Sequence, residues 1–466
     1  MENKKDFDII IVGAGPVGIY LGYRFSKMDR SVLIIEKDSK ESTGSKMDQF
    51  HLESMVFDKY EIPPPEEGTD EFITKFNYTS YFGPYGKYQQ IMEYSITAMR
   101  FQFFIQRLLL MAEKEGVEFI FSAEYKKPII KDKMLTGIKY DLNGSIHTVS
   151  ANLIVDASGS SAIVRTSLPE EIGVENFRIL DEEKMYVIQR VIEWKNPDKP
   201  HPGKGKKLES VSYLYYKTWI APHFLPNANI LGGGQPGGFE NQEKAMETFL
   251  KDVSLPPYKI VDVHKATTAY RRSPFSIVGN GFLCIGDSAC MSKSFSGEAI
   301  ESSWNVTLIA VEEIDKLLNE GLLLTQENLW DINVRFFRNQ GAKLAALLAQ
   351  IPSAANLTKK DVSYLFKHNI IFSGEDFKSM WENLELNFGF GRLFKIIGLF
   401  LGGLITRKFT KKALSTMLKY MKISGAIRNH YEEYPTDISN YDEWVSKAKD
   451  LWEPVESMRY TLEDES

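Results

Sequence analysis

The chain has 466 residues, of which 43% are hydrophobic and 25% are charged, proportions close to those of an average folded protein. At about 150 residues per domain, this length predicts roughly three domains. Asp and Glu number 62 against 56 Lys and Arg, which gives a formal net charge of −6. This balance argues against a nucleic-acid partner, because nucleic-acid-binding domains are normally basic.

Cysteine and histidine usage excludes further classes of protein. Two cysteines, Cys284 and Cys290, are too few for a disulfide scaffold or a cysteine-rich metal site. The seven histidines show no metal-ligand spacing, so we expect no metal site. The N-terminus lacks a signal-peptide pattern, and a cytoplasmic protein is therefore expected.

The first forty residues predict a strand–helix–strand unit that binds a dinucleotide. The apolar run Asp8–Val12 leads into the glycine-rich Gly13–Gly18, a helix follows to about Lys27, and a second apolar run ends on Glu36. Glycines between a strand and a helix let a pyrophosphate approach the helix N-terminus, and an acid at the next strand end can bind ribose hydroxyls. The cofactor-binding residues expected here are Gly13, Ala14, Gly15, Gly18, Glu36 and Lys37.

The apolar periodicity predicts the remaining elements in chain order. Alternating aromatic segments from about 183 to 270 are typical of an antiparallel sheet, and everything after about Ser296 is predicted to be mainly helical. The other expected elements are a helix from Ile96 to Gly116, strands at Val117–Phe121, Leu153–Ala157 and Gly281–Asp287, and a hairpin over 135–150 that turns at Asn143-Gly144.

A second glycine-rich match lies at Gly232–Gly237, but it has no strand–helix–strand context. We interpret these glycines as sheet or loop positions where another group approaches the backbone closely. They are not counted as a second nucleotide site.

Two later segments resemble the fingerprints of the FAD-dependent oxidoreductases related to p-hydroxybenzoate hydroxylase. They are Asp156–Gly159 (Asp-Ala-Ser-Gly) and Cys284–Ala289 (Cys-Ile-Gly-Asp-Ser-Ala). The resemblance implies FAD as the cofactor, with Asp287 on the ribityl or pyrophosphate part, Arg100 near the phosphates and the Ala123 backbone at the adenine. The further FAD-binding residues that it implies are Gly159, Gly297, Ala299 and Ile300.

Within that superfamily the chain resembles the archaeal geranylgeranyl reductase family over nearly its whole length. The resemblance implies an FAD-dependent reductase that saturates the double bonds of geranylgeranyl chains in membrane lipids or their precursors. It also implies a prenylated lipid substrate and an electron donor, either ferredoxin or NAD(P)H. Outside the flavin motifs, the resemblance rests on Arg165–Pro169, Tyr270–Phe275, Leu329–Asn333, Gly341–Lys343 and Tyr434-Pro435.

Three segments depart from the family pattern. The family's Pro-Cys-Gly-Asp segment corresponds to Met47–Phe50, where Asp48 replaces the cysteine. Its Tyr-x-Trp-x-Phe-Pro motif corresponds to Lys217–Pro222, which keeps Trp219 and Pro222 as candidate substrate-pocket residues, with core packing in the sheet as the alternative for Trp219. Its glycine-rich loop over the flavin corresponds to Lys293–Ala299, which keeps Gly297 and adds Glu298.

Asp48 and Glu298 are the candidate catalytic residues, because a carboxyl group whose pKa is raised by burial can exchange a proton beside a flavin. The alternatives are structural: an Asx turn for Asp48, and a first-turn acid that favours the helix dipole for Glu298. Among the histidines, only His51 lies close to Asp48 in sequence.

A basic, apolar segment lies near the C-terminus. From Leu386 to Tyr431 there are nine basic residues and no acidic residue, and Phe394–Ile405 is strongly apolar. Twelve residues are too few for a membrane-spanning helix, which needs about 20. The pattern favours an element lying on anionic headgroups, at the inner face of the membrane, and a buried helix beside solvated basic residues is the alternative.

The sequence thus predicts an α/β protein with a Rossmann-like FAD-binding domain, an inserted antiparallel β-sheet substrate domain and a helical C-terminal region. The expected ranges are 1–60, 95–165 and 265–325 for the FAD-binding domain, 61–94 and 166–264 for the substrate domain, and 326–466 for the helical region. Two other functions fit the same residues: an FAD-dependent monooxygenase or halogenase, and a flavoprotein that binds prenyl lipid without turning it over.

Overall fold

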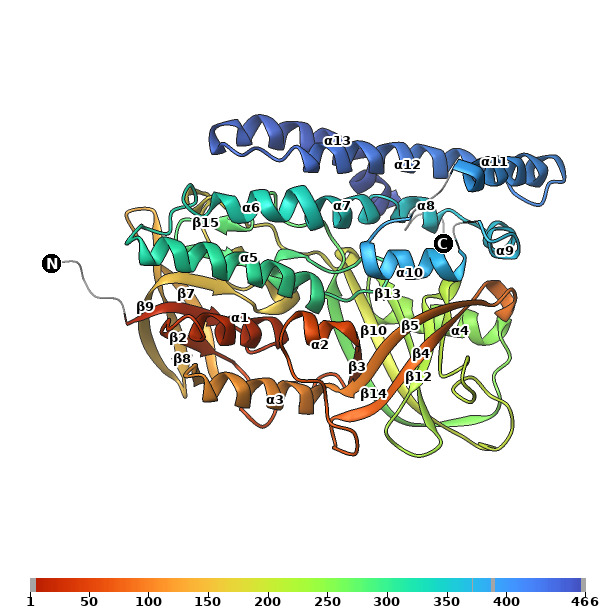
Figure 1. The fold of residues 1–466 in the computed structure, drawn as a ribbon, viewed down its shortest axis with the longest axis horizontal. Coiled ribbons are helices and arrows are strands. Elements are labelled where there is room, and N and C mark those ends of the chain that lie inside the picture. Colours follow the sequence, from red (N-terminus) through yellow and green to blue (C-terminus); the bar gives the residue numbers. More distant parts are fainter. Residues whose placement is uncertain (1–5, 371, 387–389, 462–466) are drawn as a thin grey trace.

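A computed structural model describes residues 6–370, 372–386 and 390–461 of the chain. It contains two eight-stranded sheets with helices packed around them (Figure 1). The strands are β1 Phe7–Val12, β2 Val32–Ile35, β3 Gln49–Glu53, β4 Phe72–Phe82, β5 Gln90–Arg100, β6 Glu118–Ile120, β7 Ala123–Lys131, β8 Met134–Leu142, β9 Ser145–Asp156, β10 Lys184–Trp194, β11 Ser210–Tyr213, β12 Thr218–Pro222, β13 Ala228–Pro236, β14 Tyr258–Ala269, β15 Val278–Gly279 and β16 Phe282–Cys284.

The helices frame both sheets and then form the C-terminal part of the chain (Figure 1). They are α1 Pro16–Ser26, α2 Met55–Lys59, α3 Phe101–Lys114, α4 Phe239–Asp252, α5 Ile300–Asn319, α6 Trp330–Phe336, α7 Ala342–Leu348, α8 Ile351–Ala355, α9 Lys359–Lys367, α10 Gly374–Asn383, α11 Phe390–Ile405, α12 Lys411–Glu432 and α13 Tyr441–Thr461.

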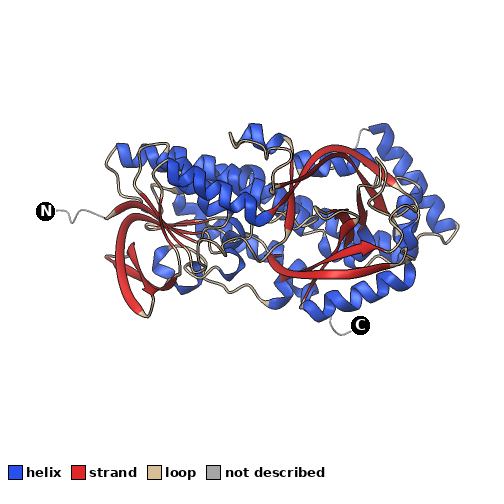
Figure 2. Cartoon of the chain, turned by 90° about the horizontal axis from the view of Figure 1, so that it is seen from below, coloured by secondary structure: helices blue, strands red, loops and turns tan. Residues whose placement is uncertain are grey.

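The first sheet has a parallel core in the order β16-β9-β1-β2-β6. β2, β16, Ile9–Val12 of β1 and Leu153–Val155 of β9 are apolar because helices cover one face of the sheet, while the antiparallel β7 and β8 extend from β9 on the other (Figure 2). The fully buried Ile9, Ile10 and Ile11 of β1 lie at its centre. The predicted hairpin at Asn143-Gly144 is confirmed, since β8 and β9 meet there.

The second sheet has the order β14-β10-β13-β12-β11-β4-β5-β3, in which only the β11–β4 pair is parallel among the neighbouring strands described. It is strongly curved, and helices of the C-terminal region lie around it (Figure 2). The predicted fold class is confirmed. Residues 49–53, which form β3, lie in the range 1–60 that is predicted for the FAD-binding domain. In the structure β3 pairs with β5 in the second sheet. β5 runs to Arg100, so the helix expected from Ile96 begins at Phe101.

The glycines of Gly232–Gly237 lie largely in β13, in the middle of the second sheet, as interpreted from the sequence. A Cβ atom on Gly232 would lie 2.2 Å from Trp219 Cε2, and one on Gly233 would lie 2.3 Å from Gln242 Nε2. The strand is therefore free of side chains where a large ring and an amide pack flat against it.

The C-terminal helices pack in two layers (Figure 1). α5, α6 and α7 lie next to the first sheet, and α11, α12 and α13 form the outer layer. The helix α12 contacts α7, α8 and α13, while α10 packs on β5 of the second sheet. The helical region therefore bridges both sheets and closes the space between them from one side.

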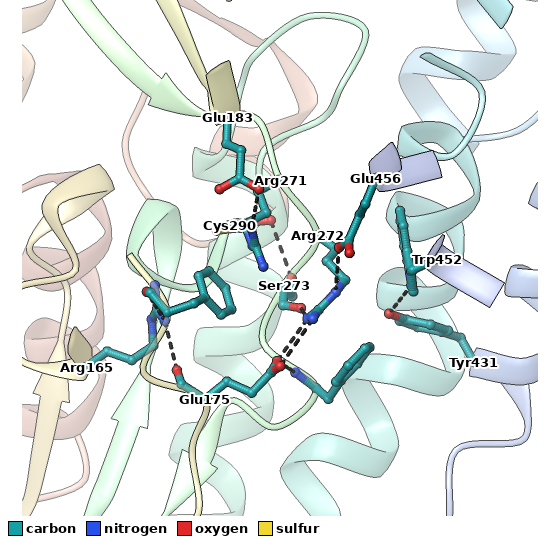
Figure 3. A network of polar contacts seen from close by, with 12 residues as sticks. Arg165, Glu175, Glu183, Arg271, Arg272, Ser273, Cys290, Tyr431, Trp452 and Glu456 are labelled. Atoms are coloured by element: carbon teal, nitrogen blue, oxygen red, sulfur yellow. Dashed lines mark hydrogen bonds and ion pairs between the residues drawn. The ribbon is translucent and has the colours of Figure 1, made fainter. Parts of the chain in front are cut away.

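A buried cluster of arginines joins the first sheet to the last helix (Figure 3). Arg165 is fully buried and donates to the Ser288 carbonyl, 2.8 Å away, directly after β16. Arg272 contacts the Glu175 carboxylate at 2.9 Å and Glu456 of α13 at 3.4 Å. Burial alone would raise the pKa of Glu175, but the charge of Arg272 holds that pKa below its usual value.

Replacing Arg272 with methionine should therefore leave a largely buried carboxylate without its cation. We expect Arg272→Met to lower the free energy of unfolding by about 3–5 kcal/mol, the usual cost of breaking a buried pair. The measurement is the midpoint of thermal unfolding followed by circular dichroism. As a control, Lys259→Met removes an exposed pair with Glu193 and should cost less than about 1 kcal/mol. Equal midpoints for the two variants would contradict a structural role for the cluster.

Candidate active site

One continuous cavity of about 2100 Å³ runs between the two sheets and on to the C-terminal helices. A site for a single small molecule usually measures about 300–1,000 Å³, so this cavity has room for a dinucleotide and a second ligand. Three groups of lining residues follow one another along it. The nucleotide end is lined by Gly13, Gly15, Glu36, Lys37, Ala123 and Gly159, the middle by His51, Glu53, Lys293, Gly297 and Glu298, and the apolar arm by Leu347, Ile351, Phe377, Ile396, Phe400 and Met417.

The glycine-rich turn has the geometry that a pyrophosphate site requires. A Cβ atom on Gly13 would lie 2.5 Å from the Ala157 carbonyl oxygen, and one on Gly18 would lie 2.2 Å from the Gly13 carbonyl oxygen, so both positions exclude a side chain. A Cβ atom on Gly15, the N-cap of α1, would meet no atom within 4 Å. The turn is therefore tight within the protein and open on the cavity side, which fits an anion at the helix N-terminus.

Glu36 lies at the end of β2, beside this turn. Its carboxylate accepts hydrogen bonds from the Ala14 N–H at 2.7 Å and from the Asp38 N–H at 3.0 Å, and its carbonyl oxygen accepts one from the Ala123 N–H at 2.8 Å. These bonds fix the carboxylate at the cavity wall next to Ala14. Lys37 also lines the wall, with its side chain exposed.

Asp287 and Gly159 lie at the carboxyl ends of neighbouring strands of the first sheet, where ligands of such folds bind. Asp287 follows β16 and accepts a hydrogen bond from the Ser292 hydroxyl at 3.0 Å. Its surroundings raise the pKa of this carboxyl, chiefly through burial. Gly159 has a positive φ of 71° with open space beside it, and both residues line the cavity.

Arg100 does not line the cavity. Its guanidinium stacks between two aromatic rings, 4.2 Å from the centre of Phe103 and 4.1 Å from the centre of Phe224. A role at the FAD phosphates would require this side chain to leave both rings. The sequence around Arg100 does not indicate that the rings of Phe103 and Phe224 pack against its guanidinium.

The loop that precedes α5 carries Gly297, Glu298 and Ala299, and α5 begins at Ile300; all four residues line the cavity. Glu298 Oε1 lies 2.7 Å from Nε2 of His51, which comes from β3 of the second sheet. Burial alone would lower the pKa of His51, but the charge of Glu298 outweighs it and raises that pKa. A histidine from the second sheet and a carboxylate from the loop before α5 therefore meet in the middle of the cavity.

A buried ion cluster supports this loop. Lys293, whose side chain is 2% exposed, lies 2.9 Å from Glu53 of β3 and 2.8 Å from Glu301 of α5. Two carboxylates share one ammonium group, so one of them keeps its proton: burial raises the pKa of Glu53 to about 8, while Lys293 lowers the pKa of Glu301 to about 2 despite burial. These two ion pairs hold the loop against β3 and α5.

Asp48, the candidate that stands at the family's cysteine position, does not line the cavity. Its carboxylate lies 2.9 Å from Nε2 of His223. Nδ1 of His223 accepts a hydrogen bond from the Leu225 N–H, so the proton of this imidazole lies on Nε2 and is donated to Asp48. The pairing turns Asp48 toward the loop after β12, and the structure thus separates it from the place where Glu298 lies.

The two candidate substrate residues lie on β12. Trp219 and Pro222 both line the cavity, and the ring of Trp219 covers Gly232. The Pro222 carbonyl oxygen accepts a hydrogen bond from the Gln49 side chain at 2.5 Å, which joins β12 to β3. Trp219 is only partly buried, so it serves both as sheet packing and as cavity wall.

Sequence reasoning missed Glu53, Lys293, Glu301 and Trp381 as site residues. Trp381 of α10 lies 5.9 Å from the His51 ring between centres and donates to the Tyr81 hydroxyl at 3.0 Å. A signal for Glu53 was present, because a lone acid at the end of a strand is unusual unless it is paired. Lys293 lies in the segment that corresponds to the family's flavin loop, but the sequence pattern assigns it no role.

Comparisons with known proteins agree with this site. Residues 6–200 match the family described as FAD binding domain, which confirms the expected cofactor, FAD. The digeranylgeranylglycerophospholipid reductase of Sulfolobus acidocaldarius is 24% identical over 454 residues, 95% of this chain and 96% of that protein. A 1H-pyrrole-2-carbonyl-[peptidyl-carrier protein] brominase of Pseudoalteromonas luteoviolacea is 25% identical over 62% of this chain and 72% of that protein.

Among solved structures, the fold is similar to that of a geranylgeranyl bacteriochlorophyll reductase-like protein from Thermoplasma acidophilum. The TM-score is 0.69 at 14% sequence identity, over 84% of this chain and 99% of that protein.

Two glycine substitutions should separate the tight turn from the cofactor contact. Gly18→Ala should destabilise the protein even without FAD, because its methyl group would meet the Gly13 carbonyl oxygen. Gly15→Ala should leave the unfolding temperature of the FAD-free protein unchanged but weaken FAD binding at least tenfold, since a methyl group there enters the space for the pyrophosphate. Thermal unfolding and FAD titration by flavin fluorescence measure the two effects. Undiminished FAD affinity in Gly15→Ala would contradict this placement of the pyrophosphate.

Proposed function

We propose that this chain, an FAD-dependent oxidoreductase that belongs to the geranylgeranyl reductase family, saturates carbon–carbon double bonds of geranylgeranyl chains in membrane lipids or their precursors. The observation that carries the proposal is the continuity of the cavity. It leads from the dinucleotide turn past His51 and Glu298 into an arm lined by apolar side chains of the C-terminal helices. A long hydrocarbon chain is the ligand that such an arm fits.

The residues present fit FAD. The space above Gly15 accepts the pyrophosphate, the Glu36 carboxylate lies where ribose hydroxyls bind, and Asp287 lies at the strand end where the resemblance places the ribityl part. When bound and reduced, FAD supplies the hydride for each double bond. An electron donor, either a ferredoxin or NAD(P)H, must provide two electrons per bond.

The protein itself contributes orientation and exclusion of water. The apolar arm holds the isoprenoid chain, and Trp219, Trp381 and Phe295 line the wall between the arm and the polar middle of the cavity. Because an isolated alkene is a weak electrophile, it also has to receive a proton from an acid in the site.

The direct test is anaerobic incubation of the reduced holoenzyme with a geranylgeranylated glycerophospholipid. We expect mass gains of two for each double bond that is saturated, up to the number of double bonds in the chains. Mass spectrometry of the extracted lipid provides the measurement, and the unaltered protein freed of FAD is the control without cofactor. Absence of any gain with several prenyl lipids, together with bromination of an aromatic substrate in air with bromide, would instead favour the halogenase alternative.

We further propose that the protein binds anionic membranes through α11 and the start of α12. None of the helices in the described residues is long and apolar enough to span a bilayer. On α11, Phe394, Ile397, Leu401 and Ile405 form one exposed apolar stripe, with exposed fractions of 73%, 47%, 56% and 82%. A stripe of this kind on one helix is typical of interfacial binding.

Basic residues surround this stripe. Arg392 pairs with Asp376, and Arg428 pairs with Glu385 and Glu432. The other seven basic residues of the segment form no ion pair within the part of the chain that the structure describes; they are Lys395, Arg407, Lys408, Lys411, Lys412, Lys419 and Lys422. Each such cation adds about 1 kcal/mol near an anionic leaflet, so the segment complements the headgroups.

The cavity reaches the surface beside the same stripe. Leu393 of α11 and Met421 of α12 both line the cavity and are exposed, by 44% and 53%. A lipid chain leaving the bilayer at this point would enter the apolar arm directly. Membrane binding and substrate uptake would therefore use one surface.

Replacing Leu401 with serine should weaken binding to vesicles that contain anionic lipid at least tenfold, since a buried leucine contributes about 1.5–3 kcal/mol. Flotation with vesicles measures the fraction of protein bound. Salt should weaken the binding of both the unaltered protein and Leu401→Ser, so the difference in bound fraction between them should become smaller. Leu110 of α3 is 53% exposed and lies far along the sequence from the stripe. Leu110→Ser is the matched control and should bind as the unaltered protein does. Equal losses in both variants would contradict a specific surface.

A further inference from the structure

Saturation of each double bond needs a proton as well as a hydride, and the family's cysteine is absent. Cys284 and Cys290, the two cysteines of the chain, are buried and do not line the cavity. Asp48, which replaces the family's cysteine, forms a hydrogen bond with His223, and neither residue lines the cavity. The proton therefore has to come from another residue.

We propose that the imidazolium of His51, held by Glu298, is the acid that protonates the alkene. This inference rests on the proposed function and names the proton donor within it. His51 lines the cavity on β3, its side chain is 39% exposed, and Nε2 lies 2.7 Å from Glu298 Oε1. Glu298 belongs to the loop that the resemblance places over the flavin ring, so the pair lies between the cofactor end and the apolar arm.

The groups around His51 favour its charged form. Glu298, which faces it from the loop, is the main charge that favours the imidazolium, and Glu53 of its own strand adds to this only when it has lost its proton. Lys293 opposes them, but its charge is largely compensated by the ionised carboxylate of Glu301, 2.8 Å away. Trp381 packs against the imidazole on the remaining side, which fixes the ring and keeps water from that face.

The step balances as follows. Because Nε2 faces Glu298, the proton that is transferred is the one on Nδ1: the alkene's π electron pair forms a C–H bond with it, the Nδ1–H bond breaks, and its electron pair stays on the imidazole. The other alkene carbon accepts the hydride that reduced FAD supplies, which oxidises the cofactor by two electrons. A proton from solvent then restores the imidazolium. Glu298 takes part as a positioning residue, because its charge stabilises the acid form of His51.

The kinetic test compares variants of the loaded enzyme. His51→Asn and His51→Gln should lower the rate of lipid saturation at least 100-fold, with unchanged FAD content and unchanged binding of the lipid. Glu298→Gln should lower the rate less than the His51 variants do. Its effect should be smallest at acidic pH, where His51 is protonated without the help of Glu298. Because the acid form of His51 is required, the rate falls as pH rises through its pKa, and in Glu298→Gln this fall should begin at a lower pH. His264→Asn, which alters a histidine–aspartate pair on the edge strand β14, should have no effect.

A second measurement does not depend on turnover. In protein with isotope-labelled histidine, the NMR signal that His51→Asn removes identifies His51. Its titration should show a pKa above that of free histidine, and Glu298→Gln should lower it. A neutral His51 below pH 6, or His51 variants that keep at least half of the rate, would overturn the proposal. Loss of the rate in Asp48→Asn with activity kept in His51→Asn would assign the proton to Asp48 instead. An unaltered enzyme that saturates no prenyl lipid would contradict the proposed function itself, which is a different result.

Discussion

The structure depends on a buried charge at the junction of its two sheets. Lys293 is 2% exposed, and an ammonium group at that depth is stable only where carboxylates lie within hydrogen-bond distance. One of them, Glu53, comes from the second sheet, and the other, Glu301, comes from the first helix after the loop. The loop that carries Glu298 therefore cannot move away from β3 or from α5 without uncovering a charge. The cavity passes through this fixed point, which sets the distance between its polar middle and its apolar arm.

Local patterns predicted the strand–helix–strand unit at the start of the chain. A buried strand, a glycine turn and a helix follow one another along the chain, so their spacing alone determines the geometry. The second sheet was predicted in type but not in membership, because β3 and β5 find their partners through pairings between distant segments. Ile96–Arg100 shows the same limit: its apolar spacing suits a helix, and pairing with β3 on one side and β4 on the other makes it a strand.

The central residues of the site were harder to predict for the same physical reason. His51 and Glu298 lie far apart in sequence, and neither has a neighbour that marks it as one of a pair. Asp48 and Glu298 were equal candidates, because each stands in a segment that corresponds to a motif of the family. The structure shows that the partner of Asp48 is His223, which no short-range spacing indicates. A motif thus locates a region of the backbone, whereas side-chain direction depends on residues the motif does not contain.

The separation of charge along the chain has an effect at long range. The chain carries −6 in total, while the segment from Leu386 to Tyr431 carries +9, so that the remainder carries −15. Such a molecule has a large electric dipole, and an anionic leaflet attracts one end while it repels the other. The protein would therefore rotate before it touches the bilayer, and each encounter would begin with α11 facing the lipid. Orientation of this kind would shorten the time that the protein needs to bring the mouth of its cavity against the lipid.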